Sequence, residues 1–145
     1  MFKHILLAID GSQASDKAVQ SALKLAKLTG AKLLAVTATE IWSALEVSGP
    51  DGRGRIQKFE AAQKVAADKI IAAFLAVAKD AGIESRTVHV PDQDAASAIV
   101  DTAKREGCDV IVMGSHGRRG LDRLLVGSQA QRVLTHATCP VLVCR

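Results

Sequence analysis

Aromatic side chains are scarce in this sequence, which has one Trp, three Phe and no Tyr among 145 residues. Proteins that bind single-stranded nucleic acid stack the bases on exposed aromatic rings, so the scarcity argues against that class. The net charge of +4 comes from 19 basic and 15 acidic residues that are spread along the chain and form no basic stripe. We therefore expect no nucleic-acid partner.

Cysteines and long apolar runs are also few. The three cysteines, Cys108, Cys139 and Cys144, form no C-x-x-C pair, so neither a disulfide framework nor a zinc site is indicated. No apolar run approaches the roughly 18 residues of a membrane-spanning helix, and no signal peptide precedes the first apolar run. We expect a cytoplasmic protein with reduced thiols and no membrane partner.

Short apolar runs alternate with segments of helical period along the whole chain. We expect strands at residues 3–9, 32–38, 85–90, 109–113 and 140–144. We expect a helix that Ser12 or Ser15 caps and Gly30 ends, and further helices at 56–81, 94–106 and about 128–136, with 43–54 as a mobile loop. The buried stripe expected for the helix at 56–81 consists of Val65, Ile70, Ile71, Phe74, Leu75 and Val77.

Continuously apolar strands separated by helices are typical of a parallel sheet that is buried on both faces. The sequence therefore predicts one α/β domain over residues 1–145, a doubly wound, Rossmann-like, five-stranded parallel sheet. Ligands of such sheets bind beyond the carboxyl ends of the strands, near the switch in strand order. Two turns are placed for binding: Asp10, Gly11 and Ser12 after the first strand, and the segment from Gly114 after the fourth.

The loop of residues 114–128 is the feature most suggestive of a phosphate site. Gly114, Gly117 and Gly127 allow positive φ angles and a close approach of a ligand to the main chain, whose N–H groups can form an anion nest. Ser128 stands where the next helix begins, so unpartnered N–H groups and the helix dipole favour an anion there. Its hydroxyl either caps that helix or contacts a phosphate.

Charged and polar side chains in the same loop fit this interpretation. Arg118 and Arg119 would neutralise a polyphosphate, and His116 would donate to it, the alternative for His116 being a solvent-facing loop residue. Asp10 would hold Mg²⁺ or a ribose hydroxyl, or else cap the first helix. The loop is not a P-loop, because no G-K-[ST] follows, and the turn at Asp10 lacks G-x-G-x-x-G.

The spacing G-x2-G-x9-G-[ST] at Gly114, Gly117, Gly127 and Ser128 resembles the nucleotide-binding branch of the universal stress protein family. The opening HILLAIDGS, the central VIVMGSHGRRGLDRLLVGS and the closing CPVLVCR extend the resemblance over the whole chain. It implies a five-stranded parallel sheet with ATP, ADP or AMP at the strand ends and Mg²⁺ accompanying the nucleotide. It also implies a homodimer through the last strand, residues 141–144.

The resemblance implies particular positions around the nucleotide. Ala8 and Val36, with Ile9 beside them, would lie near the adenine, and Asp10 at the ribose or the phosphate-bound metal. The ribose and phosphates would be surrounded by Met113, Gly114, His116, Gly117, Gly127 and Ser128. Three residues depart from the family pattern: Gln129, which would alter phosphate contacts, Gln93 and Cys144.

Three functions stay open from the sequence. The first is an ATP-binding stress-response protein whose nucleotide tunes its stability or its choice of an unknown protein partner. The second is a slow ATPase or phosphotransferase, although no nucleophile and base constellation is visible. The third is a dimeric interaction module that binds no nucleotide.

Overall fold

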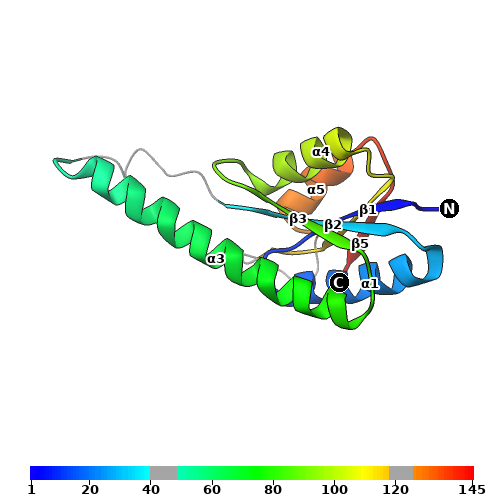
Figure 1. Cartoon of the computed structure of the whole chain (residues 1–145). Coiled ribbons are helices and arrows are strands. Elements are labelled where there is room, and N and C mark those ends of the chain that lie inside the picture. Colours follow the sequence, from blue (N-terminus) through cyan, green and yellow to red (C-terminus); the bar gives the residue numbers. More distant parts are fainter. Residues whose placement is uncertain (40–48, 118–125) are drawn as a thin grey trace.

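The computed structural model describes residues 1–39, 49–117 and 126–145, over which strands and helices alternate as the sequence predicts (Figure 1). The strands are β1 (His4–Ala8), β2 (Lys32–Ala38), β3 (Ser85–Val90), β4 (Val110–Gly114) and β5 (Val141–Cys144). The helices are α1 (Gln13–Thr29), α3 (Gly52–Asp80), α4 (Ala95–Glu106) and α5 (Ser128–His136).

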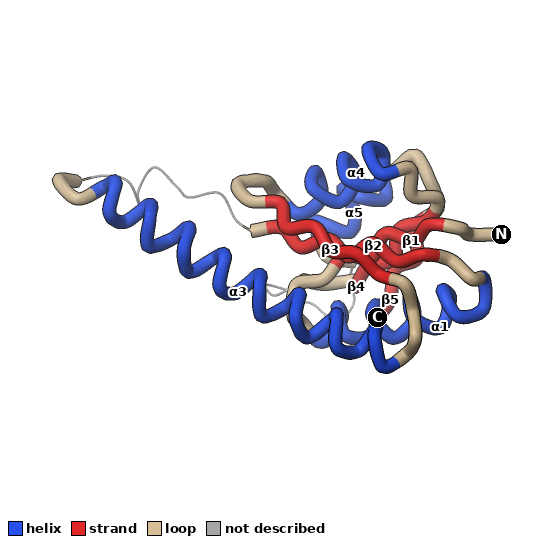
Figure 2. Tube along the Cα trace, viewed as in Figure 1, coloured by secondary structure: helices blue, strands red, loops and turns tan. Residues whose placement is uncertain are grey.

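All neighbouring strands are parallel, in the order β3-β2-β1-β4-β5. The chain builds outward from β1 through β2 to β3, then returns to the other side of β1 with β4. Because right-handed crossovers that run in opposite directions place their helices on opposite faces, α1 and α3 cover one face and α4 and α5 the other (Figure 2). The predicted doubly wound five-stranded sheet is confirmed, and its switch point lies between β1 and β4.

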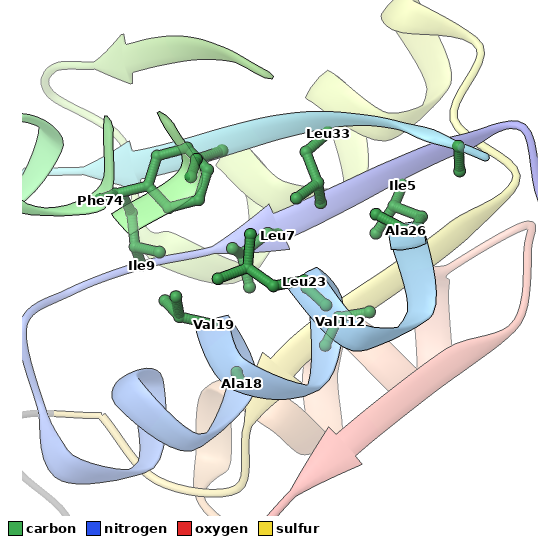
Figure 3. Packing of buried hydrophobic residues seen from close by; sticks show 14 of the residues in the cluster. Ile5, Leu7, Ile9, Ala18, Val19, Leu23, Ala26, Leu33, Phe74 and Val112 are labelled. Carbon is green, nitrogen blue, oxygen red and sulfur yellow. The ribbon is translucent and has the colours of Figure 1, made fainter. Parts of the chain in front are cut away.

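The central strand β1 is buried on both faces, which explains why its sequence is continuously apolar. Ile5 and Leu7 point toward α1 and α3, where Phe74 and Leu33 join them (Figure 3). Leu6 belongs to the cluster under α4 and α5. All three β1 side chains are fully buried, and each such burial stabilises the fold by about 1.5–3 kcal/mol.

Both serines proposed as caps for α1 contribute to the turn before it. Ser12 is the N-cap, and its Oγ accepts a hydrogen bond of 3.2 Å from the backbone N of Ser15. The Oγ of Ser15 in turn accepts 3.1 Å from the backbone N of Asp10. Gly30 ends α1 in the left-handed conformation, with φ 71°, as its position predicts.

Helix α3 differs from the prediction at its start. It begins at Gly52, not at residue 56, so Gly52, Arg53 and Gly54 are helical although their composition indicated a loop. The backbone N of Arg55 already donates 3.1 Å to the carbonyl of Asp51. Glycine disfavours a helix by about 1 kcal/mol in the interior, and the 29-residue helix tolerates it in the first turn.

The stripe predicted for α3 is only partly buried. Phe74 is 3% exposed, but Val65, Leu75 and Val77 are 63%, 38% and 39% exposed. Val65 precedes Phe74 by nine residues, which at about 100° per residue places it on the opposite side of the helix. The face that packs on the sheet is completed instead by the alanines Ala67 and Ala78, so the prediction placed too many large residues on it.

The amino-terminal half of α3 runs well past the carboxyl ends of the strands (Figure 1). Only the second half of α3 packs on the sheet, where Phe74 and Ala78 join the core under α1. Despite its length, neither α3 nor any other helix in the described ranges is both long and apolar enough to cross a membrane.

Candidate functional site

The carboxyl ends of β1 and β4 form the center of the candidate site, because these strands are neighbours at the switch point. Beyond β1 lie Asp10, Gly11 and Ser12, and beyond β4 lie Ser115, His116 and Gly117. Segments separated by about a hundred residues in the sequence are thereby brought to one edge of the sheet.

The carboxylate of Asp10 is held in a turn. Its Oδ1 accepts a hydrogen bond of 2.8 Å from the backbone N of Ser12, and its own backbone N donates to Ser15. Gly11 follows with φ 77°, a conformation that favours glycine, and a Cβ there would lie 3.3 Å from Cγ1 of Ile70. The Oδ1 contact stabilises the entry to α1, so the turn-forming role considered for Asp10 is present.

The other carboxylate oxygen of Asp10 faces the glycine loop. A Cβ atom built on Gly117 would lie 3.1 Å from Oδ2 of Asp10, and Gly117 itself is exposed. A side chain at this position would therefore contact the carboxylate of Asp10. The structure brings Asp10 and Gly117 together, as a shared site requires.

The described glycines of the loop do not adopt the positive φ angles that glycine allows. Positive φ occurs at Gly11, Gly30, Gly49, Gly82 and Gly107, but not at Gly114, Gly117 or Gly127. The reason for glycine at two of these positions is the proximity of backbone. A Cβ on Gly114 would lie 2.8 Å from the carbonyl carbon of Ala14, and one on Gly127 would lie 2.9 Å from the carbonyl oxygen of Ser115.

Two hydrogen bonds fix the base of the loop. The backbone N of Gly127 donates 2.7 Å to the carbonyl of Ser115, and the backbone N of Ser115 donates 2.6 Å to the carbonyl of Cys144 in β5. Ser115 is 3% exposed. These contacts tie the end of β4, the start of α5 and β5 together, so the two glycine clusters lie beside each other although nine residues separate Gly117 from Gly127.

The start of α5 presents backbone donors at this edge. Gly127 is the N-cap and makes no side-chain cap, and Ser128 is the exposed first residue of the helix. The proposed capping by the Ser128 hydroxyl is therefore wrong, because the N-cap position is occupied by Gly127 and Ser128 is already helical. The first N–H groups of the nine-residue helix have no intrahelical acceptor and carry partial positive charge.

His116 is half-buried, so the alternative of a solvent-facing loop histidine is wrong. Its Nδ1 lies 2.9 Å from Oγ of Ser115, and its ring packs near Gly127. Its Nε2 is buried and makes no hydrogen bond to any residue that the structure describes. A buried imidazole nitrogen without a partner is costly, which marks this position as one where a further group would be stabilising.

Gln129 makes a contact that the sequence did not indicate. Its Oε1 accepts 2.9 Å from the backbone N of Ala96, in the first turn of α4. One turn farther along α5, Nη1 of Arg132 donates 2.9 Å to Oδ2 of Asp94, the N-cap of α4. The amide oxygen of Gln129 thus binds α4, and the start of α5 is coupled to that helix.

Asp94 is the charged centre of this contact between helices. Partial burial acts to raise its pKa, but hydrogen bonds from Ser97 and the charge and hydrogen bond of Arg132 outweigh it, and the pKa is lowered from 3.8. Asp94 is therefore ionised at neutral pH, as expected for the anionic cap of a helix.

Ala8, Ile9 and Val36, which the family resemblance places near the adenine, lie at the ends of β1 and β2, and Met113, which it places near the ribose and phosphates, lies in β4. Ala8 pairs with Val36, and the backbone N of Ile9 donates 2.9 Å to the carbonyl of Val36. The side chains of Ile9, Val36 and Met113 are 4%, 2% and 5% exposed and belong to the core. Their side chains are packed inside, so the main chain at these positions borders the site.

Arg118 and Arg119 lie outside the described residues, as does Trp42. Sequence reasoning did not single out Ser115 or Ala14, which shape the loop. Ser115 stands between a strand and a glycine motif, where a hydroxyl residue is common, so only the fold reveals its contacts. No group of three or more His, Cys, Asp or Glu residues suited to a metal occurs within the described ranges.

The three cysteines are free thiols. Burial, with smaller effects from Cys139 and two carboxylates, raises the pKa of Cys108 to about 12, so its thiol stays protonated at neutral pH. Cys139 is half-buried and packs against the core cluster to which Cys108 belongs.

The model of the universal stress protein family matches residues 1–145. A universal stress protein of Thermus aquaticus is 37% identical over 148 residues, covering all of both chains. The solved universal stress protein UspA of Lactobacillus plantarum is 26% identical, with a TM-score of 0.82, and the match covers 99% of this chain and 98% of that one.

Two more distant structures share the fold and were solved with nucleotides. One is a universal stress protein of Archaeoglobus fulgidus in complex with dAMP, 19% identical, with a TM-score of 0.72 over 100% of this chain and 98% of that chain. The other is from Arabidopsis thaliana with AMP bound, 16% identical, with a TM-score of 0.67 over 98% and 90%. With its full length matched and its strand order shared, this chain belongs to the universal stress protein family.

Proposed function

We propose that this protein binds an adenine nucleotide, ATP, ADP or AMP, at the edge of the sheet between β1 and β4, and that occupancy tunes a stress response. The observation that carries the proposal is the hydrogen bond of 2.7 Å from Gly127 to Ser115. It places the N-terminus of α5 beside the glycines that follow β4, where phosphates would meet free N–H groups.

Different residues would contact the phosphates, the ribose and the adenine. The phosphates would lie at Gly117, Gly127 and Ser128, with Arg118 adding charge. The ribose would lie at Asp10, whose Oδ2 is close to Gly117. The adenine would border the main chain of Ala8, Ile9, Val36, Met113 and Gly114.

Two further residues of the set take less direct parts. Nε2 of His116, which has no hydrogen-bond partner among the described residues, would donate a hydrogen bond to the nucleotide. Gln129 would act through its bond to α4 and only secondarily on a phosphate.

Mg²⁺ belongs to the same proposal. A hard cation takes oxygen ligands, and Asp10 with nucleotide phosphates and water would supply them. The fit rests on the oxygen chemistry of the carboxylate and on the proximity of Asp10 Oδ2 to Gly117, where a Cβ atom would lie 3.1 Å from it. The metal would offset phosphate charge, while the chain's own part would be to hold the carboxylate fixed through Ser12.

Binding is favoured over catalysis. The site offers Asp10 and His116 as titratable groups, and Asp10 already accepts from Ser12. Slow ATP hydrolysis or phosphotransfer remains the second candidate, and Asp10→Ala tests it: a turnover rate equal to that of the unchanged protein would show that the activity comes from a contaminant.

A homodimer through β5 completes the proposal. β5 is the last strand of the sheet order, and Leu142 on it is 43% exposed. An edge strand offers unpaired N–H and C=O groups to a second copy. Sedimentation of the protein and of Leu142→Lys tests this interface, and cell fractionation tests the cytoplasmic location expected from the sequence.

The direct test is mass spectrometry of small molecules released from freshly purified protein, combined with melting curves in AMP, ADP and ATP with Mg²⁺. Ligands that bind only the folded state raise the melting temperature. Ser128→Ala should reduce the rise, whereas Thr135→Ala, which removes a hydroxyl at the other end of α5, should leave it unchanged. No released nucleotide and no rise with any of the three would refute the proposal.

A further inference from the structure

A separate recess lies between the carboxyl ends of β2 and β3 and α3. Figure 1 shows the half of α3 that runs past the sheet at this end of the strands. Its volume is about 360 Å³, within the usual range for sites of small ligands. Thr39, His89 and Asp92 line it from the strand ends, and Phe59, Glu60 and Gln63 line it from α3. None of these residues belongs to the nucleotide site proposed above.

The floor of the recess is fixed by hydrogen bonds. Oγ1 of Thr39 lies 3.0 Å from Nε2 of His89, and the backbone N of Thr39 donates 3.1 Å to the carbonyl of Val90. Thr39 is 8% exposed. These bonds hold the imidazole in one orientation, so the recess has a polar base that does not need a ligand to form.

The recess carries excess negative charge. Glu60 and Asp92 both line it, and neither forms an ion pair with another residue of the described chain. Among the described lining residues Lys64 is the one lysine or arginine, and its Nζ lies 3.0 Å from Oδ2 of Asp68, which itself lies outside the recess. An anion is disfavoured in such surroundings, and a cation is favoured.

The other residues that line the recess suit a planar or apolar group attached to that cation. The ring of Phe59 is half-buried and lines the recess, and a cation over an aromatic face gains about 0.5–1 kcal/mol at an exposed site. The amide of Gln63 offers both a donor and an acceptor and makes no hydrogen bond to another described residue. Asp92 holds φ 54°, which keeps its carboxylate at the strand end.

We propose that this recess is a second ligand site, which binds an organic cation with a planar body, such as an aromatic amine, an amidinium or a guanidinium compound. The carboxylates of Glu60 and Asp92 neutralise the cationic group, Phe59 packs against the planar body, and Gln63 and His89 hydrogen-bond its edge. The chemistry excludes a phosphate here, which separates this site from the nucleotide edge between β1 and β4.

The test uses the full chain labelled with ¹⁵N and titrated with benzamidine, a planar cation, or with benzoate, which has the same ring and the opposite charge. The titrations are repeated in saturating AMP, so that binding in the recess is distinguished from binding at the nucleotide site between β1 and β4. We expect benzamidine to shift the backbone amides of Thr39, Gln63 and His89, with a Kd on the order of millimolar, with or without AMP. Benzoate should not shift them.

Charge-neutralising variants test the two carboxylates of the recess against a matched control outside it. Glu60→Gln and Asp92→Asn should each weaken benzamidine binding about threefold, as expected for a partly exposed ion pair, and asparagine tolerates the positive φ at residue 92. Asp80→Asn makes the same charge change on α3 outside the recess and should have no effect. Equal shifts with benzoate, no shifts with benzamidine, or equal weakening by Asp80→Asn would each overturn the proposal.

Discussion

A Cβ atom on Gly114 would lie 2.8 Å from both the carbonyl carbon and the Cβ of Ala14, where the end of β4 meets the first turn of α1. Atoms this close must move apart, and the nearest one belongs to the backbone. The first glycine of the loop is therefore required for packing between β4 and α1, whatever ligand the loop binds. Gly114 and Gly117 have different roles, and substitutions at the two positions report different properties.

Gly114→Ala should destabilise the fold, because the added methyl group overpacks the contact with Ala14. We expect a loss of about 1–3 kcal/mol in the free energy of unfolding, measured by denaturant titration. In a double-mutant cycle with Ala14→Gly, the two changes should be less destabilising together than the sum of the single effects. Strict additivity would mean that the added methyl group clashes with the main chain of residue 14 and not with the Cβ of Ala14.

Gly117→Val should separate binding from stability. Residue 117 is exposed and has no positive φ, so we expect a change within about 0.5 kcal/mol in the free energy of unfolding. The side chain would fill the space beside Oδ2 of Asp10 and weaken nucleotide binding at least tenfold, about 1.4 kcal/mol. Calorimetric titration with AMP measures this. A fully stable variant that binds AMP as well as the unchanged protein would remove Gly117 from the site.

Gln129→Ala should destabilise the contact between α5 and α4. The change leaves the backbone N of Ala96 without its acceptor, and loss of such a cap costs about 1 kcal/mol. Gln57→Ala, on the exposed surface of α3, serves as the control and should change the free energy of unfolding little. Hydrogen exchange of the Ala96 amide provides the local measurement: the idea fails if its protection is the same in Gln129→Ala as in the unchanged protein.

The lowered pKa of Asp94 predicts how the free energy of unfolding changes with pH in the acid range. Its pKa is lowered in the folded state, so its contribution to stability is present above the unfolded pKa near 3.8 and is lost as pH falls through the lower folded value. Asp94→Asn should destabilise the protein at pH 7, and the difference from the unchanged protein should shrink below about pH 3.8. Unfolding curves from pH 7 to pH 2.5 measure it. A difference that stays constant with pH would contradict the ionised cap.

The sequence predicted the sheet well because the signals for it are local. The continuous apolar run of β1 and the glycine at residue 30 indicate a buried strand and the end of a helix without reference to the rest of the chain. The doubly wound parallel architecture followed from the alternation of elements and from the family resemblance, whereas the order of the strands came from the structure. The turn at Asp10 was found because a polar residue directly after a buried strand lies at the ligand edge.

The sequence could not predict contacts that depend on the distance between elements. In the sequence, Gly114 and Gly127 suggested backbone flexibility. The structure shows that glycine is needed there because the backbones of Ala14 and Ser115 lie too close for a Cβ atom. Gln129 looked like a departure from a phosphate motif, but its partner Ala96 is 33 residues away. The exposure of Val65 was missed because apolar residues surround most of α3, and their pattern alone does not say which side meets the sheet.

The central claim is that the edge between β1 and β4 binds an adenine nucleotide. Isothermal titration of the purified full-length protein, freed of any bound nucleotide, with ATP, ADP and AMP in the presence of Mg²⁺ tests it most directly. The account predicts saturable binding of at least one of the three with one site per chain, weakened at least about tenfold, or 1.4 kcal/mol, by Gly117→Val. No binding of any of them to the folded protein would contradict it.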